Sequence, residues 1–325
     1  MTQQVCPEGV ALLDGKATYY VADNKDPNNY LDKMQDCDAL IVRIASCDAN
    51  VIEHSPNLKV IGRTGVGYDS VDVKKATEKG IPVVITPGAN SRSVAEHTLA
   101  LILALAKNLC EAQSEMLKGN WKIRDAGKVC DVENKTVGII GFGNIGRIVG
   151  QMCNGIGMKV VAYDPVLSKE KIESAGAQYC PDVESLLKIS DFVTIHVPLL
   201  DSTYHMIGEK ELSMMKKTAY IINCSRGGIV DDEALVRALK AGVIAGAGFD
   251  VFSSSEPPAK DDVLLDCPNI IITPHSAAQS REAVIRMAQM CVNGCLAVCE
   301  GKKWPYVADK KVYDHPKWKD AEWAF

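Results

Sequence analysis

The sequence lacks the features of an exported, membrane-spanning or nucleic-acid-binding chain. Residues 1–7 contain no basic patch followed by an apolar core, so they do not predict a signal peptide. The longest apolar run, residues 99–106, is far shorter than the ~18–20 residues that a bilayer span needs. Acidic residues outnumber basic ones, 41 to 36, which gives no support to nucleic-acid binding. The cytoplasm is therefore the expected location.

Cysteine is plentiful, but no two of the twelve cysteines have the Cys-x-x-Cys spacing of a zinc ribbon or a thioredoxin-like motif. In a reducing compartment such cysteines are typically buried as small apolar side chains. Cys291, Cys295 and Cys299 would share one face of a helix, but no histidine or fourth cysteine follows at ligand spacing. We therefore expect these three thiols to pack in the core, and we expect no metal site.

What is present is a regular alternation of short Val- and Ile-rich runs with longer helical segments. The length of 325 residues and a hydrophobic fraction of 47% are typical of a globular chain with two domains. Several runs are continuously apolar, as in strands that are buried on both faces. The alternation predicts an α/β fold with parallel sheets and right-handed crossovers. Strands are expected at residues 18–21, 39–44, 59–61, 82–85, 136–140, 159–163, 192–197, 219–223, 244–250 and 270–273.

These strands are numerous enough for two sheets, and the break between them follows the helix expected over residues 93–109. After a polar stretch, a second block of strands begins at residue 136 with a Gly-rich turn behind it. The helix expected over residues 280–299 is long enough to return to the first block. We therefore predict a discontinuous first domain, residues 1–100 and 278–325, with a second domain, residues 101–277, inserted into it. The chain leaves no room for an appended regulatory domain, and we expect none.

The most informative motif is Gly-Phe-Gly-Asn-Ile-Gly at residues 141–146, between an apolar strand and an amphipathic helix. This is the context that a dinucleotide-binding loop requires. Gly141 permits the tight turn, Gly143 lets the backbone approach a pyrophosphate, and Gly146 lets the helix pack on the strand. The free N–H groups at the start of the helix would face the anion. The motif therefore predicts a dinucleotide site.

An acidic residue follows this motif at the expected distance. Asp164 ends the next strand, 18 residues past Gly146, close to the ~20 residues expected. Its carboxylate would accept both adenosine ribose hydroxyls and repel a 2′-phosphate, and residues 163–168 contain no arginine. NAD is therefore favoured over NADP. A tight turn without a ligand, a methyltransferase and a flavin site are the alternatives.

Polar segments also follow three later strands, at residues 223–228, 248–258 and 273–276. The carboxyl ends of parallel strands are where α/β sheets bind ligands. Hydride transfer to a carbonyl needs a cation to hold the oxo acid, a proton donor, and a group that keeps this donor protonated. The candidates for these tasks lie in the three segments, which contain Arg226, Glu256 and His275.

With these residues the chain resembles the D-isomer-specific 2-hydroxyacid dehydrogenases, in particular their phosphoglycerate dehydrogenase branch. The matching segments are residues 65–72, 90–96, 141–146, 196–199, 223–228, 249–257 and 274–275. The resemblance implies two Rossmann-like or flavodoxin-like parallel-sheet domains, with the NAD-binding domain inserted into a discontinuous substrate domain. It also implies an NAD-dependent oxidoreductase that acts on a CH–OH donor.

The resemblance assigns roles to the three candidates. Arg226 is implied to bind the substrate carboxylate and carbonyl through its forked donors. His275 is implied as the proton donor and acceptor, and Glu256 as the carboxylate that pairs with it and raises its pKa. The family usually has two residues between the strand-end Phe and this Glu, whereas here three serines, residues 253–255, intervene. The loop therefore either bulges or displaces Glu256.

Further contacts are implied by the same resemblance, although each residue also has the simpler interpretation of a packed turn. They are Asn144 and Ile145 at the pyrophosphate, Val197 and Pro198 at the adenosine, Cys224, Ser225 and Arg226 beside the nicotinamide ribose, Asp250 at the carboxamide, Ala277 and Ala278 after His275 at the nicotinamide, and Val66 and Gly67 at the substrate carboxylate.

The substrate depends on cationic side chains of the first domain. Arg43 ends a strand at the position where phosphoglycerate dehydrogenases meet the substrate phosphate, and Arg63 and Arg92 are other candidates. A salt bridge from Arg43 to Asp69 is the structural alternative. We expect D-3-phosphoglycerate and 3-phosphohydroxypyruvate, in amino-acid biosynthesis, with glyoxylate, hydroxypyruvate and other 2-oxo acids as rivals. An NAD(H)-sensing scaffold, like the corepressors of this family, is the alternative of another class.

Two further segments bear on assembly. Family members commonly dimerise through the cofactor domain, which implies a homodimer. The apolar helix over residues 93–109 is a candidate interface, although burial inside the domain explains it equally well. His97 on this helix is expected to be a core or interface histidine. Residues 301–325 carry six of the nineteen aromatic residues, so we expect this tail to pack on the first domain or a partner subunit.

Overall fold

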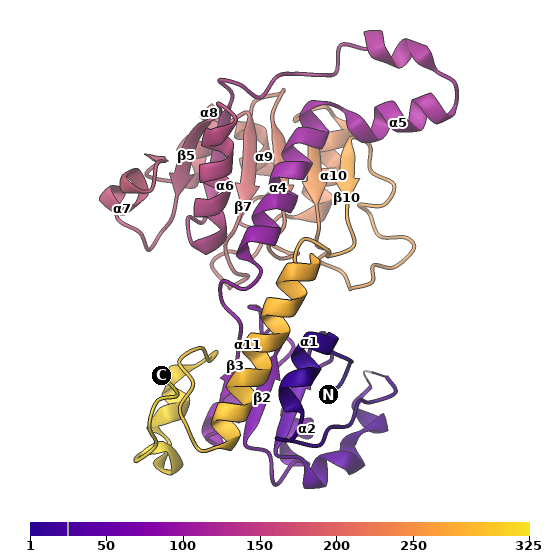
Figure 1. Cartoon of the computed structure of the whole chain (residues 1–325). Coiled ribbons are helices and arrows are strands. Elements are labelled where there is room, and N and C mark those ends of the chain that lie inside the picture. The colour runs from indigo at the N-terminus through magenta and orange to yellow at the C-terminus, as the bar shows by residue number, and fades with distance from the viewer. Residues whose placement is uncertain (25) are drawn as a thin grey trace. The chain divides into compact units, whose positions relative to one another are not determined.

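The computed structural model describes residues 1–24 and 26–325, which form two compact units. Unit 1 contains residues 1–90 and 279–325, and unit 2 contains residues 91–278 (Figure 1). The predicted α/β fold, with one parallel-sheet unit inserted into the other, is confirmed. The boundary after residue 100 is wrong, because residues 91–100 belong to a helix, α4 (Ser91–Ala106), that packs on unit 2. The return to unit 1 comes at residue 279 instead of 278.

Unit 2 is built on a seven-stranded sheet whose strands are all parallel, in the order β10-β9-β8-β7-β4-β5-β6. The order reverses at β4, which pairs with both β5 and β7, so the segment after β4 lies at the switch point of the sheet. The strands are β4 (Thr136–Ile140), β5 (Lys159–Tyr163), β6 (Gln178–Tyr179), β7 (Phe192–Ile195), β8 (Tyr220–Asn223), β9 (Gly246–Phe249) and β10 (Ile270–Ile272).

Helices cover both faces of this sheet and give a three-layer arrangement (Figure 1). One core joins the sheet to α4 and α6 through residues such as Ile102 and Val149. The other joins it to α8, α9 and α10 through residues such as Leu186 and Leu235. The remaining bounds are α5 (Leu109–Leu117), η4 (Trp121–Asp125), α6 (Asn144–Gly155), α7 (Lys169–Ser174), α8 (Val183–Ile189), α9 (Glu209–Met214) and α10 (Asp232–Lys240).

Unit 1 has a smaller parallel sheet of three strands in the order β1-β2-β3. Within residues 1–24, the strand expected at 18–21 does not form, and Tyr19 and Tyr20 are exposed instead of buried. The elements are β1 (Ala39–Val42), β2 (Val60–Arg63), β3 (Val83–Val84), α1 (Pro7–Val10), α2 (Ala49–Glu53), α3 (Val73–Glu78) and α11 (Arg281–Cys299), with short 3-10 turns η1 (Ala11–Leu13), η2 (Pro27–Asn29), η3 (Leu31–Asp36), η5 (Lys310–Asp314) and η6 (Pro316–Trp318).

Helix α11 is the core helix of unit 1. Among the described residues it is the single helix long and apolar enough to cross a membrane, beside the bent pair of α4 and residues 109–117, but its apolar face packs on β1 and β2. A Cβ at Gly62 on β2 would collide with the sulfurs of Cys291 and Cys295, so these thiols pack as predicted. The twelve cysteines, all of them described, are free thiols. Burial raises the pKa of Cys47 and Cys153 to about 12.

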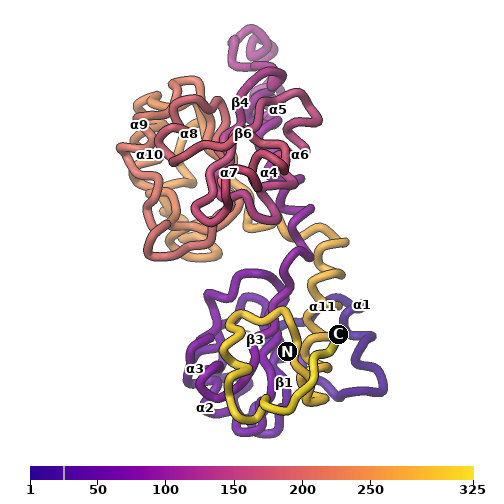
Figure 2. The backbone as a smooth tube through the Cα atoms, turned by 90° about the vertical axis from the view of Figure 1, so that its left-hand side faces the viewer, coloured from indigo at the N-terminus to yellow at the C-terminus, as the bar shows by residue number. Residues whose placement is uncertain are grey.

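The aromatic tail packs on unit 1, as the sequence predicts. Trp304 and Trp318 are buried in the core that α11 forms with the sheet. Val307 pairs with Val84 of β3, and the C-terminal segment runs beside this strand in Figure 2. The indole N–H of Trp318 donates to the carbonyl of Gly80 at 2.8 Å. The tail therefore completes the core of unit 1.

Candidate active site

The turn between β4 and α6 has the geometry of an anion-binding loop. Gly141 has a φ of +91°, and a Cβ there would lie 2.6 Å from the carbonyl oxygen of His196. At Gly143 a Cβ would meet no described atom within 4 Å, so the turn is open on that side. No described side chain caps α6, and the first N–H groups of a helix have no partner within it. These features fit a pyrophosphate at Asn144 and Ile145.

Asp164, at the end of β5, holds this turn in place. Its Oδ2 accepts from the N–H of Phe142 at 2.8 Å, while Oδ1 accepts from Val166 at 2.9 Å and Leu167 at 3.1 Å. A carboxylate offers about four acceptor positions, so about one is left. The sequence predicts that Asp164 accepts both ribose hydroxyls; the structure gives most of its acceptor capacity to the backbone.

One residue of the cofactor set, Val197, lies beside the loop, and others follow β7 and β8. The side chain of Val197, after β7, lies against Gly141, where an added Cβ would be 2.8 Å from its Cγ1. Pro198 follows, and its carbonyl accepts from Thr203 Oγ1 at 2.7 Å. Cys224, after β8, is buried, and burial raises the pKa of its thiol to about 12. Burial lowers the pKa of His196 to about 3, so this imidazole is neutral.

A buried amide shapes the turn that carries Arg226. Asn223, the last residue of β8, donates from Nδ2 to the carbonyl of Arg226 at 2.8 Å. Its Oδ1 accepts from the N–H and the hydroxyl of Ser225, at 3.0 and 2.7 Å. The guanidinium of Arg226 donates from Nη1 to the carbonyl of Ser225 at 2.7 Å. Asn223 is thus a positioning residue for the Arg226 turn, a role that the sequence pattern does not predict.

His275 and Glu256 form a direct pair. His275 Nδ1 lies 2.5 Å from Glu256 Oε2, and the side chains are 41% and 39% exposed, so a small ligand can reach them. Burial alone would raise the pKa of Glu256, but the hydrogen bond and charge of His275 and the charge of Arg226 lower it below its ordinary value. Unit 2 therefore brings all three candidates together.

The three serines before Glu256 hold its loop through hydrogen bonds, and the one extra residue does not separate Glu256 from His275. The Ser253 hydroxyl donates to Asp232 at the start of α10, and Ser254 donates to Asp262 at 2.5 Å. Ser255 donates to the carbonyl of Pro257 at 2.8 Å. A Cβ at Gly227 would collide with the backbone of Phe252, so this glycine lets the Arg226 turn touch the Glu256 loop.

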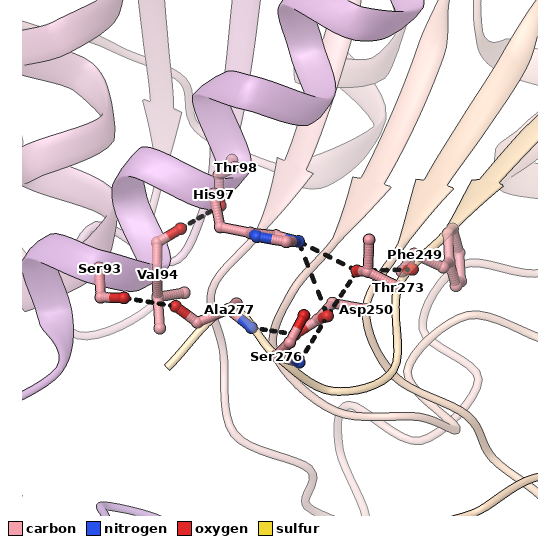
Figure 3. A network of polar contacts seen from close by, with 9 residues as sticks. All are labelled: Ser93, Val94, His97, Thr98, Phe249, Asp250, Thr273, Ser276 and Ala277. Carbon is pink, nitrogen blue, oxygen red and sulfur yellow. Dashed lines mark hydrogen bonds and ion pairs between the residues drawn. The ribbon is translucent and has the colours of Figure 1, made fainter. Parts of the chain in front are cut away.

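Asp250, after β9, is fully buried and bound to the turn around His275 (Figure 3). Oδ1 accepts from the Thr273 hydroxyl at 2.5 Å and from the N–H of Ser276 at 2.9 Å, and Oδ2 accepts from the N–H of Ala277 at 2.9 Å. The resemblance implies that Asp250 contacts the carboxamide; in the structure its oxygens accept from the Thr273 hydroxyl and from two backbone N–H groups. Ala277 is buried and Ala278 packs beside it in the same core, as the simpler interpretation holds.

The substrate candidates of unit 1 follow two adjacent strands. Arg43 comes directly after β1 and Arg63 ends β2, where it pairs in register with Val42. Arg43 Nη2 donates to Gln279 Oε1 at 2.6 Å, and Arg63 Nη1 donates to the carbonyl of Thr64 at 2.6 Å. Val66 is exposed and Gly67 partly so. Arg92 lies instead in unit 2, 2.6 Å from Glu96.

Comparisons with known proteins agree with this geometry. Residues 99–277 match the family model described as the NAD-binding domain of D-isomer specific 2-hydroxyacid dehydrogenases. A glyoxylate reductase from Korarchaeum cryptofilum is 41% identical over 286 residues, which are 87% of this chain and 86% of that protein. A D-3-phosphoglycerate dehydrogenase from Methanocaldococcus jannaschii is 43% identical over 284 residues, 87% of this chain and 54% of that protein. The chain thus spans about half the length of that relative.

A solved structure gives the same result. The crystal structure of D-lactate dehydrogenase from Aquifex aeolicus, in complex with NAD and lactic acid, matches with a TM-score of 0.81. It is 31% identical, and the match covers 91% of this chain and 94% of that one.

Proposed function

The chain belongs to the D-isomer specific 2-hydroxyacid dehydrogenase family, and we propose that it interconverts D-3-phosphoglycerate and 3-phosphohydroxypyruvate. It is an NAD-dependent oxidoreductase that acts on a CH–OH group. The single observation that carries the chemistry is the pair of His275 and Glu256, 2.5 Å apart, on loops that adjoin the Arg226 turn.

Each of the three side chains has one task in this proposal. The Arg226 fork binds the substrate carboxylate and polarises the carbonyl at C2. When the oxo acid is reduced, the imidazolium of His275 gives its proton to the new alkoxide; in the oxidation direction, neutral His275 accepts the hydroxyl proton. Glu256 orients the ring through Nδ1, which leaves Nε2 to face the substrate oxygen.

The cofactor is held by the turn after β4 in this proposal. Gly141, Gly143 and Gly146 shape the turn, and the N–H groups of Asn144 and Ile145 bind the pyrophosphate. Asp164 keeps the turn closed and offers its remaining acceptor position to the adenosine ribose. When bound, NAD supplies the site at C2 with a hydride acceptor, or NADH with a donor.

Two arginines support a phosphorylated substrate. Arg43 directly follows β1, Arg63 ends the adjacent parallel strand β2, and the Gly65–Gly67 segment begins two residues after Arg63. A guanidinium group suits a phosphate, which accepts forked hydrogen bonds. The test is NADH oxidation with 3-phosphohydroxypyruvate, hydroxypyruvate and glyoxylate. We expect the phosphorylated acid to have the highest kcat/KM; a preference for glyoxylate would contradict the proposal on the substrate alone.

Glyoxylate is the second candidate because a relative of similar identity has that activity in its name. The Korarchaeum relative, 41% identical, is named glyoxylate reductase, and the Methanocaldococcus relative, 43% identical, is named D-3-phosphoglycerate dehydrogenase. In the same assay, no turnover of any 2-oxo acid by a chain that binds NADH tightly would favour a cofactor-sensing scaffold instead.

We further propose that the protein acts in the cytoplasm, in amino-acid biosynthesis, as a homodimer. On the helix expected to supply the interface, residues 93–109, the side chains of Leu101, Ile102 and Leu105 of α4 are buried inside unit 2. The next segment is different. Residues 109–117 of α5 include no buried side chain, and Leu117 is 82% and Trp121 64% exposed on an arm that extends from the sheet (Figure 1).

Light scattering tests this assembly. We expect a mass of two chains for the wild type and of one chain for the double variant Leu117→Asp, Trp121→Asp, because charges at these positions oppose apolar packing. A monomeric wild type would contradict the dimer and leave the reaction unaffected.

A further inference from the structure

A second histidine, His97 on α4, contacts the network beneath the His275 turn. Its Nε2 lies 3.0 Å from the hydroxyl of Thr273 and 3.6 Å from Oδ1 of Asp250 (Figure 3). The His97 side chain is 23% exposed and comes from a helix that precedes Thr273 by 176 residues. The proposed reaction uses Arg226, Glu256 and His275, and His97 has no part in it.

The direction of the hydrogen bonds follows from the donors present. Asp250 accepts from the N–H groups of Ser276 and Ala277, so it serves this turn as an acceptor. A threonine hydroxyl has a single proton. The Thr273 hydroxyl uses this proton to donate a hydrogen bond to Asp250 at 2.5 Å. The hydroxyl oxygen therefore accepts the hydrogen bond from His97 Nε2–H. The chain of donors therefore runs from His97 through Thr273 to Asp250.

This chain ends on the residues directly after His275. His275 has a φ of +51°, a left-handed conformation that a non-glycine residue keeps only when its surroundings fix it. Its own N–H donates to the carbonyl of Thr273 at 3.0 Å, and Asp250 holds the next two N–H groups. Asp250 is buried, so its carboxylate depends on the Thr273 hydroxyl and on these two N–H groups as donors.

We propose that His97 is a positioning residue for His275. By donating to Thr273, His97 fixes the orientation of the hydroxyl and of the Asp250 carboxylate, and thereby the turn that presents the His275 ring. This inference rests on the proposed function for the role of His275, but the contacts themselves do not. The competing interpretation is that His97 only fills space under α4, in which case a side chain of similar size without a donor replaces it.

The test compares two substitutions at this position. Gln keeps an N–H donor near the place of Nε2, whereas Phe keeps the bulk and removes the donor. For His97→Phe we expect a fall in kcat of about 10- to 100-fold with little change in the KM of the 2-oxo acid, because small misplacements of a catalytic group cost rates of this order. His97→Gln should retain most of the activity. The same two substitutions at His54, an exposed histidine of unit 1, are the matched control and should change neither value.

A second measurement does not depend on turnover. Without cofactor, amide hydrogen exchange at Ser276 and Ala277 should be faster in His97→Phe than in His97→Gln or the wild type. Thr273→Val removes the linking hydroxyl, should reproduce the effect, and should not add to that of His97→Phe in the double variant. If His97→Phe does not fold, Thr273→Val and His97→Gln decide the question.

The two proposals fail in different ways. Unchanged exchange at 276 and 277 together with an unchanged kcat in a folded His97→Phe protein would overturn the positioning role, even if the thermal midpoint falls. A wild type without turnover would overturn the proposed function, while faster exchange in His97→Phe would still support the link from His97 to the turn.

Discussion

The strand ends of the two units differ in how firmly they hold their polar side chains. In unit 2, Asn223 and Asp250 are buried, and each is bound to several groups of the turn beside it. In unit 1, Arg43 is exposed and donates one side-chain hydrogen bond to Gln279, and Val66 is exposed as well. Unit 2 therefore fixes the groups assigned to the chemistry, whereas unit 1 presents groups that one or two substitutions can alter.

This difference bears on a split among the relatives of this chain. Proteins about 40% identical to this chain are named for two different activities, glyoxylate reduction and phosphoglycerate dehydrogenation. Substitutions that change the preferred substrate by altering only exposed side chains of unit 1 leave the buried network of unit 2 intact. We therefore expect substitutions in unit 2 to lower the rate with every substrate, and those in unit 1 to change the order of substrates.

The largest effect is expected at His275. His275→Ala removes the proton donor, and kcat should fall by about 100- to 10,000-fold for every 2-oxo acid, the range of general acid catalysis. Stopped-flow or steady-state NADH oxidation measures it, and a Kd for NADH close to that of the wild type shows that the cofactor site is intact. His54→Ala in unit 1 is the control. If His275→Ala and His54→Ala lost kcat equally, the two units would not differ in their contribution to the chemistry.

A smaller loss is expected at Glu256. Glu256→Gln keeps the shape of the side chain but replaces a charged partner of His275 with a neutral one. A hydrogen bond to a charged group contributes about 1.5–3 kcal/mol, so kcat should fall toward 100-fold at the upper end of this range, again for all substrates. A loss confined to one substrate would show that Glu256 acts on specificity instead.

Arg43 should show the opposite pattern. For Arg43→Ala, kcat/KM for 3-phosphohydroxypyruvate should fall about 10-fold, the lower end of the same range, while the value for glyoxylate stays the same. Arg92→Ala is the matched control, because Arg92 is already paired with Glu96 in unit 2. An equal loss with both acids would mean that Arg43 supports the fold and does not contact a phosphate.

The parts of this architecture that the sequence predicts are those with a local signal. Residues 136–140 and 159–163 form strands with the predicted bounds, because each is a short Val- and Ile-rich run, and the glycine spacing at 141–146 identifies the turn between them. β6 escapes prediction because it has only two residues, Gln178 and Tyr179, neither of them aliphatic. The expected helix at 93–109 is real, but its periodicity does not tell which unit it packs on.

The side-chain network is less predictable because its partners are distant in the chain. Asp250 has no sequence signal that distinguishes an acceptor for a cofactor amide from an acceptor for the N–H groups of residues 276 and 277. His97 meets Thr273 across 176 residues, a contact that depends on how α4 packs on β8 and β9. The three serines before Glu256 leave the position of its carboxylate open until their own partners, Asp232 and Asp262, are known.

The smallest effects concern pH and stability, and they compare two carboxyls within unit 2. The folded pKa of Glu256 is lowered, so its contribution to the free energy of unfolding is present above the unfolded pKa of about 4.3 and is lost as the pH falls through the folded pKa. The pKa of Asp232 is raised, chiefly by burial, so this carboxyl lowers stability as the pH rises from about 3.9 through its folded pKa.

Relative to the wild type, Glu256→Gln should therefore become less stable with rising pH, and Asp232→Asn should become more stable. Urea unfolding at about pH 3 and pH 6 measures both slopes. Glu256 is 39% exposed, so solvent screening keeps the pH dependence of its contribution small. If the two variants changed in stability with pH in the same direction, the pKa of Asp232 would not be raised by burial while that of Glu256 is lowered by pairing.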